Sequence, residues 1–160
     1  MTGPQNLSDD LSELIGLFLF HRVEFIVVGA HALALYSRPR FTEDLDLFIR
    51  RSDENCLRLQ KALQEFGIDL PSSARLQLSK DRRAMIVLGA KPNQVDILNF
   101  LDGVEFEPAL KNGQVSKLGG MDVVFLSLSD VIATKTATGR PKDIDDLNRL
   151  REQLGSEFPA

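Results

Sequence analysis

The sequence predicts a single α/β (α+β) domain, in which a central mixed β-sheet lies between helices from both ends of the chain. The chain has 160 residues, enough for one hydrophobic core and too few for two domains of ordinary size. Hydrophobic residues make up 43% and charged residues 26%, as in ordinary globular proteins. Apolar residues recur at helical spacing near both ends, whereas apolar and polar residues alternate in the middle. No repeat or Gly/Pro/Ser-rich linker divides residues 1–160.

The first third of the chain predicts a helix, a strand and a second helix. Apolar residues at helical spacing over residues 7–20 indicate the first helix, with Ser8 or Asp9 as its N-cap. The apolar run 24–29, "EFIVVG", is typical of a short buried strand that ends in glycine. Residues 30–37 then predict a helix that begins directly after this glycine.

The strand predicted at residues 44–49, "DLDLFI", carries two carboxylates on one face. Successive side chains of a strand point to opposite faces, so Asp44 and Asp46 share a face. Their Cα atoms are expected to lie about 6.6 Å apart at the usual rise per residue. Aspartate is a poor strand former. The presence of two aspartates in this strand is therefore explained either by a solvated strand face or by a function.

The middle of the chain predicts one helix followed by several strands. Ser52 and Gly67 are suitable start and stop residues for a helix over 53–66. Alternation then predicts three strands, at 75–80, 83–89 and 94–100. A short helix over "FEPALKN" and a hairpin-like pair of strands follow, at 106–112, 113–120 and 121–127.

The last third predicts two helices. Ser127 and Asp130 have the spacing of a capping box, Gly139 is suited to end the first helix, and Pro141 is suited to the first turn of the next. The apolar face of the final helix is expected to consist of four residues, Ile144, Leu147, Leu150 and Leu154. Four phenylalanines are expected in the core, namely Phe25, Phe41, Phe48 and Phe100.

Charge and cysteine content favour a cytoplasmic protein. Cys56 is the single cysteine, no apolar run approaches the length of a membrane span, and the N-terminus is polar rather than signal-like. The net charge of −4 argues against a protein that coats duplex nucleic acid, although a local basic pocket is compatible with it. Four basic clusters could line such a pocket, Arg38/Arg40, Arg50/Arg51, Lys80/Arg82/Arg83 and Lys135/Arg140/Lys142.

The glycine turn and the aspartate strand together indicate a phosphate and metal site. Gly29 allows close approach of the backbone to a ligand, and the helix that follows offers N–H groups and a positive dipole end. Asp44 and Asp46 would supply hard oxygen ligands for Mg²⁺. Two such ions could activate a hydroxyl and stabilise a leaving pyrophosphate.

At this point "VVGA" followed by "DLDL" resembles the polymerase-β-like nucleotidyltransferase superfamily, whose hallmark is hG[G/S] and a later Dh[D/E]h. The resemblance implies the nucleotidyltransferase fold and transfer of a nucleoside monophosphate from an NTP to a hydroxyl, with two Mg²⁺ ions bound. It also implies a third carboxylate on a later strand, for which Asp96 in "QVDILNF" is the candidate. Ala30 stands where the superfamily usually has Gly or Ser, so a serine hydroxyl is absent while the backbone N–H remains.

The segment "DVIATKTATGRPKDIDD" resembles small bacterial abortive-infection (AbiEii-like) nucleotidyltransferases, with Asp130, Lys135, Arg140, Lys142, Asp143 and Asp146 on the shared pattern. The combined resemblance covers residues 24–150 and implies catalytic roles for Asp44, Asp46, Asp96 and Lys135. It implies nucleotide binding by seven residues, Gly29, Ala30, Arg40, Thr42, Arg140, Asp143 and Asp146. Toxin-like relatives modify RNA, typically the tRNA 3′ end, which implies an RNA acceptor and a possible antitoxin partner.

Structural interpretations stand beside these functional ones. Asp44 and Asp46, or Asp96, could belong to solvated strand faces, and Lys135 could simply complement a helix dipole. His31 and Cys56 are expected to be packed residues without a ligand role. The alternatives for the whole chain are a non-catalytic nucleotide- or metal-binding module, a toxin–antitoxin binding module, and a transferase that acts on a protein or a small molecule.

Overall fold

A computed structural model of the chain describes residues 7–37 and 42–159. Its centre is a six-stranded mixed sheet in the order β3-β4-β2-β1-β6-β5. The strands are β1 (Phe25–Val28), β2 (Asp44–Ile49), β3 (Met85–Leu88), β4 (Gln94–Leu98), β5 (Gln114–Leu118) and β6 (Met121–Phe125). The β1–β6 and β2–β4 pairs are parallel and the other pairs are antiparallel, so the mixed sheet predicted from the sequence is confirmed.

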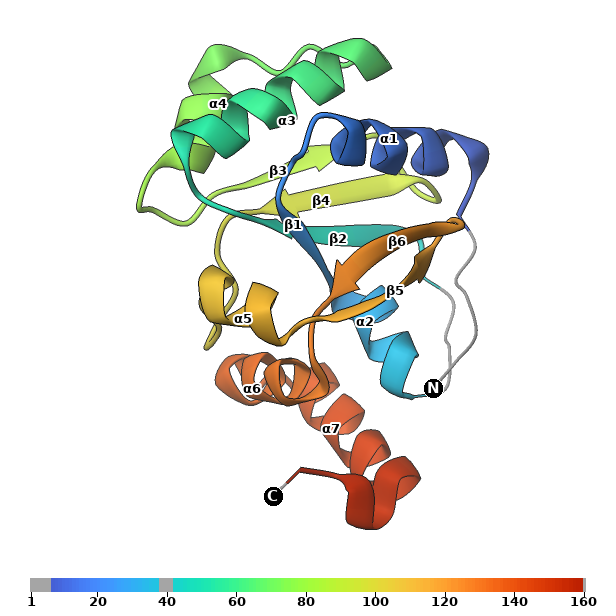
Figure 1. Cartoon of the computed structure of the whole chain (residues 1–160). Coiled ribbons are helices and arrows are strands. Elements are labelled where there is room, and N and C mark those ends of the chain that lie inside the picture. Colours follow the sequence, from blue (N-terminus) through green and yellow to red (C-terminus); the bar gives the residue numbers. More distant parts are fainter. Residues whose placement is uncertain (1–6, 38–41, 160) are drawn as a thin grey trace.

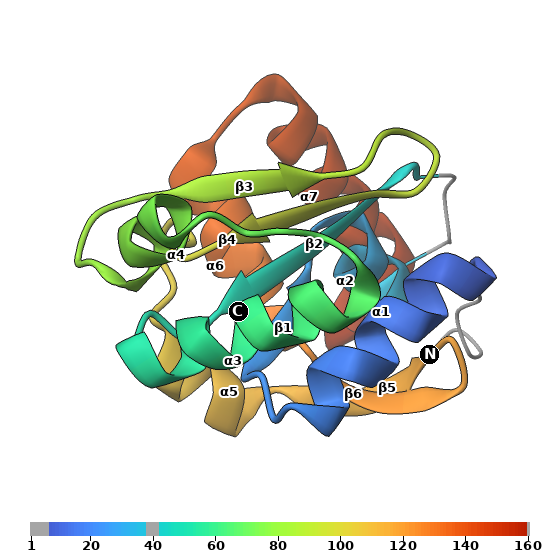
Figure 2. The same cartoon turned by 90° about the horizontal axis from the view of Figure 1, so that it is seen from above.

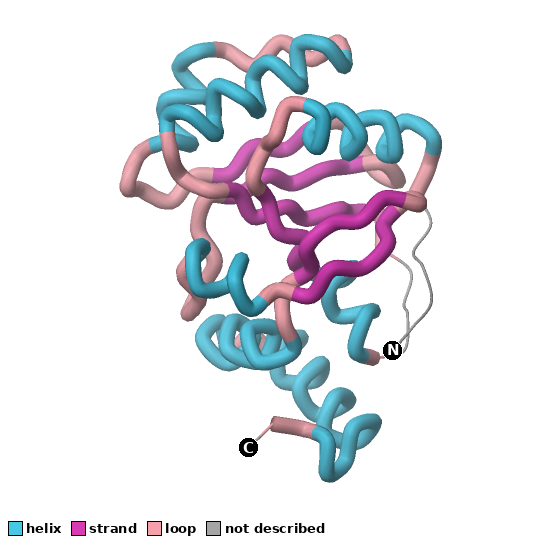
Figure 3. The backbone as a smooth tube through the Cα atoms, viewed as in Figure 1, coloured by secondary structure: helices cyan, strands magenta, loops and turns pink. Residues whose placement is uncertain are grey.

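Helices cover both faces of the sheet (Figures 1 and 3). They are α1 (Asp9–Phe20), α2 (Gly29–Tyr36), α3 (Asp53–Phe66), α4 (Ser72–Ser79), α5 (Phe106–Asn112), α6 (Leu128–Thr138) and α7 (Pro141–Leu154), with a short 3₁₀ turn at Gly155–Glu157. Figure 2 shows α1, α3 and α4 lying over one face, and α2, α5, α6 and α7 lie on the other side. None of the helices in the described part of the chain is long and apolar enough to cross a membrane.

The alternation in β2 separates a packed face from a functional face. Leu45, Leu47 and Ile49 are buried in the core. The two aspartates of the strand point to the opposite side, toward α2 and α6. The core therefore anchors β2 through one face and leaves the other face free to present Asp44 and Asp46.

The predicted helix ends are confirmed in detail. The hydroxyl of Ser8 accepts a hydrogen bond from the N–H of Leu11, and Ser52 and Ser127 cap α3 and α6 in the same way. Gly67 and Gly139 end α3 and α6 in the left-handed conformation, with φ of 104° and 59°. Pro141 is the first residue of α7, and Phe25, Phe48 and Cys56 are buried as expected.

Two expectations are wrong. Residues 75–80 do not form a strand, because Ser72–Ser79 forms α4 directly after Pro71. The segment has no β-branched or aromatic residue, and Leu76 and Leu78 lie on different sides of the helix, exposed and buried respectively. Ile144 is 49% exposed and does not belong to the packed face of α7, where the buried residues are Asp143, Asp146, Leu147 and Leu150. Phe41 lies outside the described residues.

Asn99 holds the loop after α4 to the end of β4. Its side chain is 1% exposed, and its carbonyl oxygen accepts a hydrogen bond from the N–H of Ala84 at 2.7 Å. Its amide donates to the carbonyl oxygens of Leu78 and Arg82, both at 3.0 Å. One buried side chain thus satisfies three backbone groups and fixes residues 79–84 relative to the sheet.

We expect Asn99→Ala to lower the free energy of unfolding by about 2–3 kcal/mol, because it leaves buried backbone groups without partners. Asn148 lies exposed on α7, so Asn148→Ala is the matched control and should change stability by less than about 0.5 kcal/mol. Urea denaturation of the three proteins makes the comparison. Equal midpoints for Asn99→Ala and the wild type would show that Asn99 does not hold this loop.

Candidate active site

The turn at Gly29 is shaped by the side chain that lies against it. Gly29 has φ of +67°, and a Cβ built on it would lie 2.1 Å from Oδ2 of Asp46. Both the backbone conformation and the space therefore require glycine here. α2 begins at this residue, and no described side chain caps its first turn. The N-terminus of α2 thus meets the carboxylate of Asp46 with no side chain between them.

Asp44, Asp46 and Asp96 form a carboxylate row, the name used below for these three residues. β2 and β4 pair in parallel, with Asp46 directly opposite Asp96 and Asp44 opposite Gln94. The side chains of paired residues lie on the same face of a sheet, so the three carboxylates share the face that carries Gly29. The amide of Gln94 donates a 2.9 Å hydrogen bond to Oδ1 of Asp96. The structure thus brings Asp96 beside Asp44 and Asp46, from which it is far apart in the sequence.

The crowding of negative charge changes the protonation of the carboxylate row. Burial, and after it the nearby Asp96 and Asp44, together raise the pKa of Asp46 to about 7. The charge of Lys142 acts against this shift. A proton kept on Asp46 near neutral pH relieves the repulsion between these carboxylates.

The carboxylate row suits a hard cation by the chemistry of its donors. Oδ1 of Asp44 is buried and has no hydrogen-bond partner among the described residues. Nζ of Lys91 is 4.0 Å from Oδ2 of Asp44. Among residues 7–37 and 42–159, no three His, Cys, Asp or Glu side chains are already gathered as a metal-binding group. Unpaired carboxylate oxygens that repel one another still fit Mg²⁺ or Mn²⁺, which would replace the proton on Asp46.

A network of charged side chains joins α6 to α7, and we call it the α6–α7 corner (Lys135, Thr138, Arg140, Asp143 and Asp146). Asp143 and Asp146 are 1% and 3% exposed, so their charges need partners. Nζ of Lys135 lies 2.9 Å from Asp146 and 3.7 Å from Asp143. Thr138 donates a 2.7 Å hydrogen bond to Asp143, and the Arg140 guanidinium holds the pKa of Asp143 well below its usual range.

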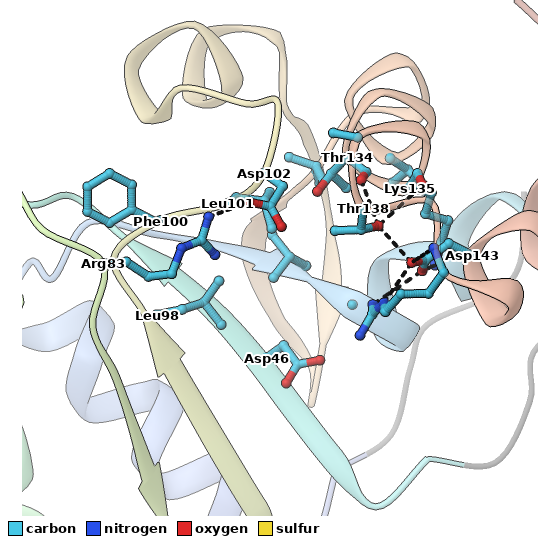
Figure 4. A pocket seen from close by; sticks show the side chains of 16 residues that line it. Asp46, Arg83, Leu98, Phe100, Leu101, Asp102, Thr134, Lys135, Thr138 and Asp143 are labelled. Atoms are coloured by element: carbon cyan, nitrogen blue, oxygen red, sulfur yellow. Dashed lines mark hydrogen bonds and ion pairs between the residues drawn. The ribbon is translucent and has the colours of Figure 1, made fainter.

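A pocket of about 630 Å³ is lined by Asp46 of the carboxylate row and by Lys135, Thr138, Arg140 and Asp143 of the α6–α7 corner. Figure 4 shows Asp46 between two walls of this pocket. One wall contains Lys135, Arg140 and Asp143 with Thr134 and Thr138. The other, named here the Phe100 wall, consists of Arg83, Leu98, Phe100, Leu101 and Asp102. Gly29 lines the pocket as well, so the N-terminal end of α2 opens into it.

One pocket residue was misread from the sequence, Asp102 was not predicted, and Arg83 was predicted only as a member of a basic cluster that could line a pocket. Phe100 was expected in the core, but it lines the pocket with the Arg51 guanidinium 4.0 Å from its ring centre. Arg83 and Asp102, which pair with each other, also line the pocket. The signal for Phe100 was its position just after the alternating stretch 94–98, where the strand has ended and a side chain can face a cavity.

The remaining predicted residues have local roles or lie elsewhere. The hydroxyl of Thr42 accepts a hydrogen bond from the N–H of Asp44 and so shapes the entry to β2. Ala30 is the second residue of α2, immediately beside the turn. Arg40 lies outside the described residues. Burial lowers the pKa of His31, whose ring is also hydrogen-bonded to the backbone of Asp44.

Comparison with known proteins gives the family of the chain. The family model described as nucleotidyl transferase of unknown function (DUF2204) matches residues 7–158. No curated protein matches the chain. The match spans the sheet, the carboxylate row and the α6–α7 corner, so it covers every part of the candidate site.

We expect Gly29→Ala to lower the free energy of unfolding by about 2–4 kcal/mol, from backbone strain and from the collision with Asp46. Gly120 also has positive φ (+82°) but no neighbour within 4 Å of a built Cβ. Gly120→Ala is therefore the control for strain alone, at about 1 kcal/mol. In an Asp46→Ala background the cost of Gly29→Ala should shrink. An unchanged loss in the free energy of unfolding in that background would show that the Asp46 side chain is not the reason why residue 29 must be glycine.

The raised pKa of Asp46 predicts how stability depends on pH without divalent cations. The folded protein keeps a proton that the unfolded chain releases near pH 4, so stability should fall as pH rises from about 4 to 7. The lowered pKa of His31 acts in the opposite direction near neutral pH, so the comparison is made with Asp46→Asn. The melting temperature, measured in EDTA, should fall more from pH 5.5 to pH 8 in the wild type than in Asp46→Asn. Equal losses would contradict the assignment.

Proposed function

The chain belongs to the family of nucleotidyl transferases of unknown function (DUF2204), and from this premise we propose that it is a Mg²⁺-dependent enzyme that moves a nucleoside monophosphate from an NTP to a hydroxyl acceptor. The observation that supports this proposal best is the contact of Asp46 with Gly29, in register with Asp96. It brings the glycine turn that would bind phosphate next to the carboxylates that would hold cations.

Asp44, Asp46 and Asp96 would hold two Mg²⁺ ions, which supply charge neutralisation and a more acidic acceptor hydroxyl. The backbone N–H groups of Gly29 and Ala30 bind the phosphate chain at the N-terminus of α2. Thr42 supports this site indirectly, by fixing the backbone of Asp44.

The transfer step follows from these positions. The acceptor oxygen attacks the α-phosphorus of the NTP, and a new P–O bond forms. The bond from the α-phosphorus to the bridging oxygen breaks, and pyrophosphate leaves with the electron pair. Asp96 takes the proton of the attacking hydroxyl, because its carboxylate stands in the carboxylate row where the hydroxyl approaches.

The α6–α7 corner is proposed to receive the β- and γ-phosphates. Lys135 is 13% exposed and is oriented by Asp143 and Asp146, so its ammonium group is held in place before a ligand binds. Arg140 has an exposed side chain fixed at one end by Asp143. Two positioned cations facing the pocket can neutralise the charge that develops on the leaving pyrophosphate. Asp143 and Asp146 thus act on the nucleotide through Lys135 and Arg140.

The finer proposals rest on the resemblance of residues 130–146 to AbiEii-like transferases. They are a toxin-type enzyme in the cytoplasm, RNA as the acceptor with the tRNA 3′ end as the first substrate to test, and a partner protein as antitoxin. The second candidate function is a nucleotide- or metal-binding module without transfer activity. Ala30 favours it, because the hydroxyl that serine would offer to a phosphate is missing.

We expect the pure protein, incubated with Mg²⁺, each α-labelled NTP and total RNA, to transfer label to an RNA species. Asp96→Asn should reduce the rate by about 10²-fold or more, because the proton acceptor is lost. The same change relieves repulsion in the carboxylate row, so the variant should melt at a higher temperature at pH 8 in EDTA.

The matched control is Asp122→Asn, because Asp122 is an exposed strand residue on β6, paired with Lys117. It should leave the transfer rate unchanged. A wild-type rate for Asp96→Asn would contradict its catalytic role. Binding of Mg²⁺ and NTP without transfer to any acceptor would favour the non-catalytic module.

A further inference from the structure

β3 forms an open edge of the sheet. It stands at one end of the strand order, and in the part of the chain that the structure describes only β4 pairs with it (Figure 2). Residues 84–88, "AMIVL", are five apolar residues in a row. The strand at the opposite edge, β5, carries Gln114, Ser116 and Lys117, and polar or charged residues of this kind discourage an added strand. β3 has no such protection, so its edge is suited to pair with another polypeptide.

The pairing of β3 with β4 decides which backbone groups face the open edge. Ala84 is bonded toward the β4 side, because its carbonyl oxygen accepts from the N–H of Asn99 at 3.2 Å and its own N–H donates to Oδ1 of Asn99 at 2.7 Å. In an antiparallel ladder every second residue of a strand bonds to the same neighbour, so Ile86 also bonds to β4. The N–H and C=O groups of Met85 and Val87 therefore point outward. These four groups are the ones that a further strand would bond.

One face of this edge accepts apolar side chains. Met85 and Val87 are 57% and 51% exposed. They lie on the face of the carboxylate row, because Val87 pairs in register with Asp96. An acidic side chain added on this face would increase the repulsion around Asp96, whereas an apolar side chain would cover Met85 and Val87.

The other face of the edge has a cavity lined by cations. Ala84 directly precedes Met85, so its side chain lies on the face opposite to the carboxylate row. The cavity has a volume of about 410 Å³ and we call it the basic cavity; it is lined by Gln77, Lys80, Arg82, Arg83 and Ala84. Three of these five residues are cationic and none is acidic. A strand added to β3 would place the residue opposite Ala84 on this face, where an acidic side chain would meet positive charge.

The positive charge at this end of β3 is only partly neutralised. Lys80 and Arg82 are exposed, and neither forms an ion pair with another described residue. The acidic residue between them, Asp81, is bound by Arg51 at 3.0 Å. Lys80 and Arg82 are therefore available to a carboxylate from outside the chain.

Charge makes a second copy of the chain an unsuitable occupant of the edge. Antiparallel two-fold pairing of β3 with its own copy would bring the Arg82 end of each strand to the Lys91 end of the other, so like charges would meet at both ends. An acidic partner has the complementary charge. A nucleic acid has it too, but it offers no ladder of N–H and C=O groups to Met85 and Val87. An acidic polypeptide fits both the charge and the open ladder.

We propose that β3 is the docking edge for an extended, acidic segment of a partner protein, which adds to the sheet as a further strand. The backbone of the segment bonds to Met85 and Val87, its apolar side chains cover these two residues, and an acidic side chain opposite Ala84 enters the basic cavity. This inference is independent of the transferase function, because it uses none of the groups assigned to the metal ions, the NTP or the acceptor.

The first experiment measures hydrogen exchange of single amides by NMR. In the free protein, the amides of Met85 and Val87 should exchange much faster than those of Ile86 and Leu88, which β4 protects. The probe is the peptide Glu-Glu-Val-Thr-Val-Glu-Glu, which reads the same in both directions. Its valines come opposite Met85 and Val87, and its inner glutamates come opposite Ala84 and Leu88. At saturation it should slow exchange at Met85 and Val87 by about tenfold.

Two control peptides separate charge from strand pairing. Replacement of all four glutamates by lysine should raise the Kd by about tenfold or more, because like charges then meet at the basic cavity. Methylation of the three central backbone amides should abolish binding, because it removes the donors of the added strand. Equal affinity of the lysine peptide would contradict an acidic partner. Equal affinity of the methylated peptide would contradict strand addition.

The second experiment changes the protein. Lys80→Glu/Arg82→Glu should weaken binding of the acidic peptide by about tenfold or more. The control Lys61→Glu/Lys111→Glu makes the same change in net charge at exposed positions on α3 and α5 and should bind as the wild type does. Val87→Pro removes one outward N–H and leaves the ladder with β4 intact, so it should keep the fold and lose the peptide. Equal weakening by both double variants, or unchanged binding by Val87→Pro, would overturn the proposal.

Other occupants of the edge would give different results. Slow exchange of Met85 and Val87 in the free protein would show that the edge is already covered, by a second copy if the rates depend on protein concentration. A single-stranded RNA that binds at Lys80 and Arg82 without slowing exchange at Met85 and Val87, where the acidic peptide does not bind, would assign the basic cavity to nucleic acid. Each of these results would overturn the proposal, and none of them would change the transferase assay.

Discussion

The close approach of the Asp46 carboxylate to the Cα of Gly29 is the constraint on which the site depends. It requires β1 and β2 to pair in the register that sets Val28 opposite Asp46, and it excludes a side chain at the turn. The same register turns Leu45 and Leu47 into the core, so packing of one face of β2 fixes what the other face presents. A shift by one residue would bury the carboxylates and expose the leucines. Stability and site geometry therefore depend on one pairing.

The α6–α7 corner also positions charged side chains, and it does so independently of the pairing of β1 with β2. The sequence suggests that Lys135 stands in a cluster of like charges, but its ammonium group lies between two buried aspartates. Removal of Lys135 would take away the ammonium group that neutralises these two acids, and this would lower stability. The contribution of Lys135 to stability and any contribution to phosphate binding therefore come from the same side chain. Asp143 also bonds Thr138 and the backbone N–H of Arg140, which locks the turn between the two helices.

Local patterns in the sequence predicted much of the fold, and the misses have physical causes. Alternation predicted β2 and β4, and the serine caps and terminal glycines predicted α3 and α6, because these signals act over a few residues. The alternating leucines of residues 75–80 failed as a strand signal, because Leu78 reaches the core from a helix. The carboxylate row was predicted in its members, but the register of Asp96 with Asp46 needs tertiary structure. Arg83 and Phe100 could not be assigned, because their neighbours come from different elements.

The parallel pairing of β2 with β4 has a consequence for how the protein folds. The two strands are separated by α3, α4 and β3, so a crossover of about fifty residues must be in place before Asp96 meets Asp46. Closure of such a long loop is slow compared with formation of the hairpin of β5 and β6, and here it also opposes the mutual repulsion of two acids. We therefore expect docking of β4 to be a late event on the folding pathway. A cation or a proton that neutralises the two acids would accelerate the docking of β4. Magnesium in the refolding buffer would therefore change the rate of folding as well as the stability of the folded protein.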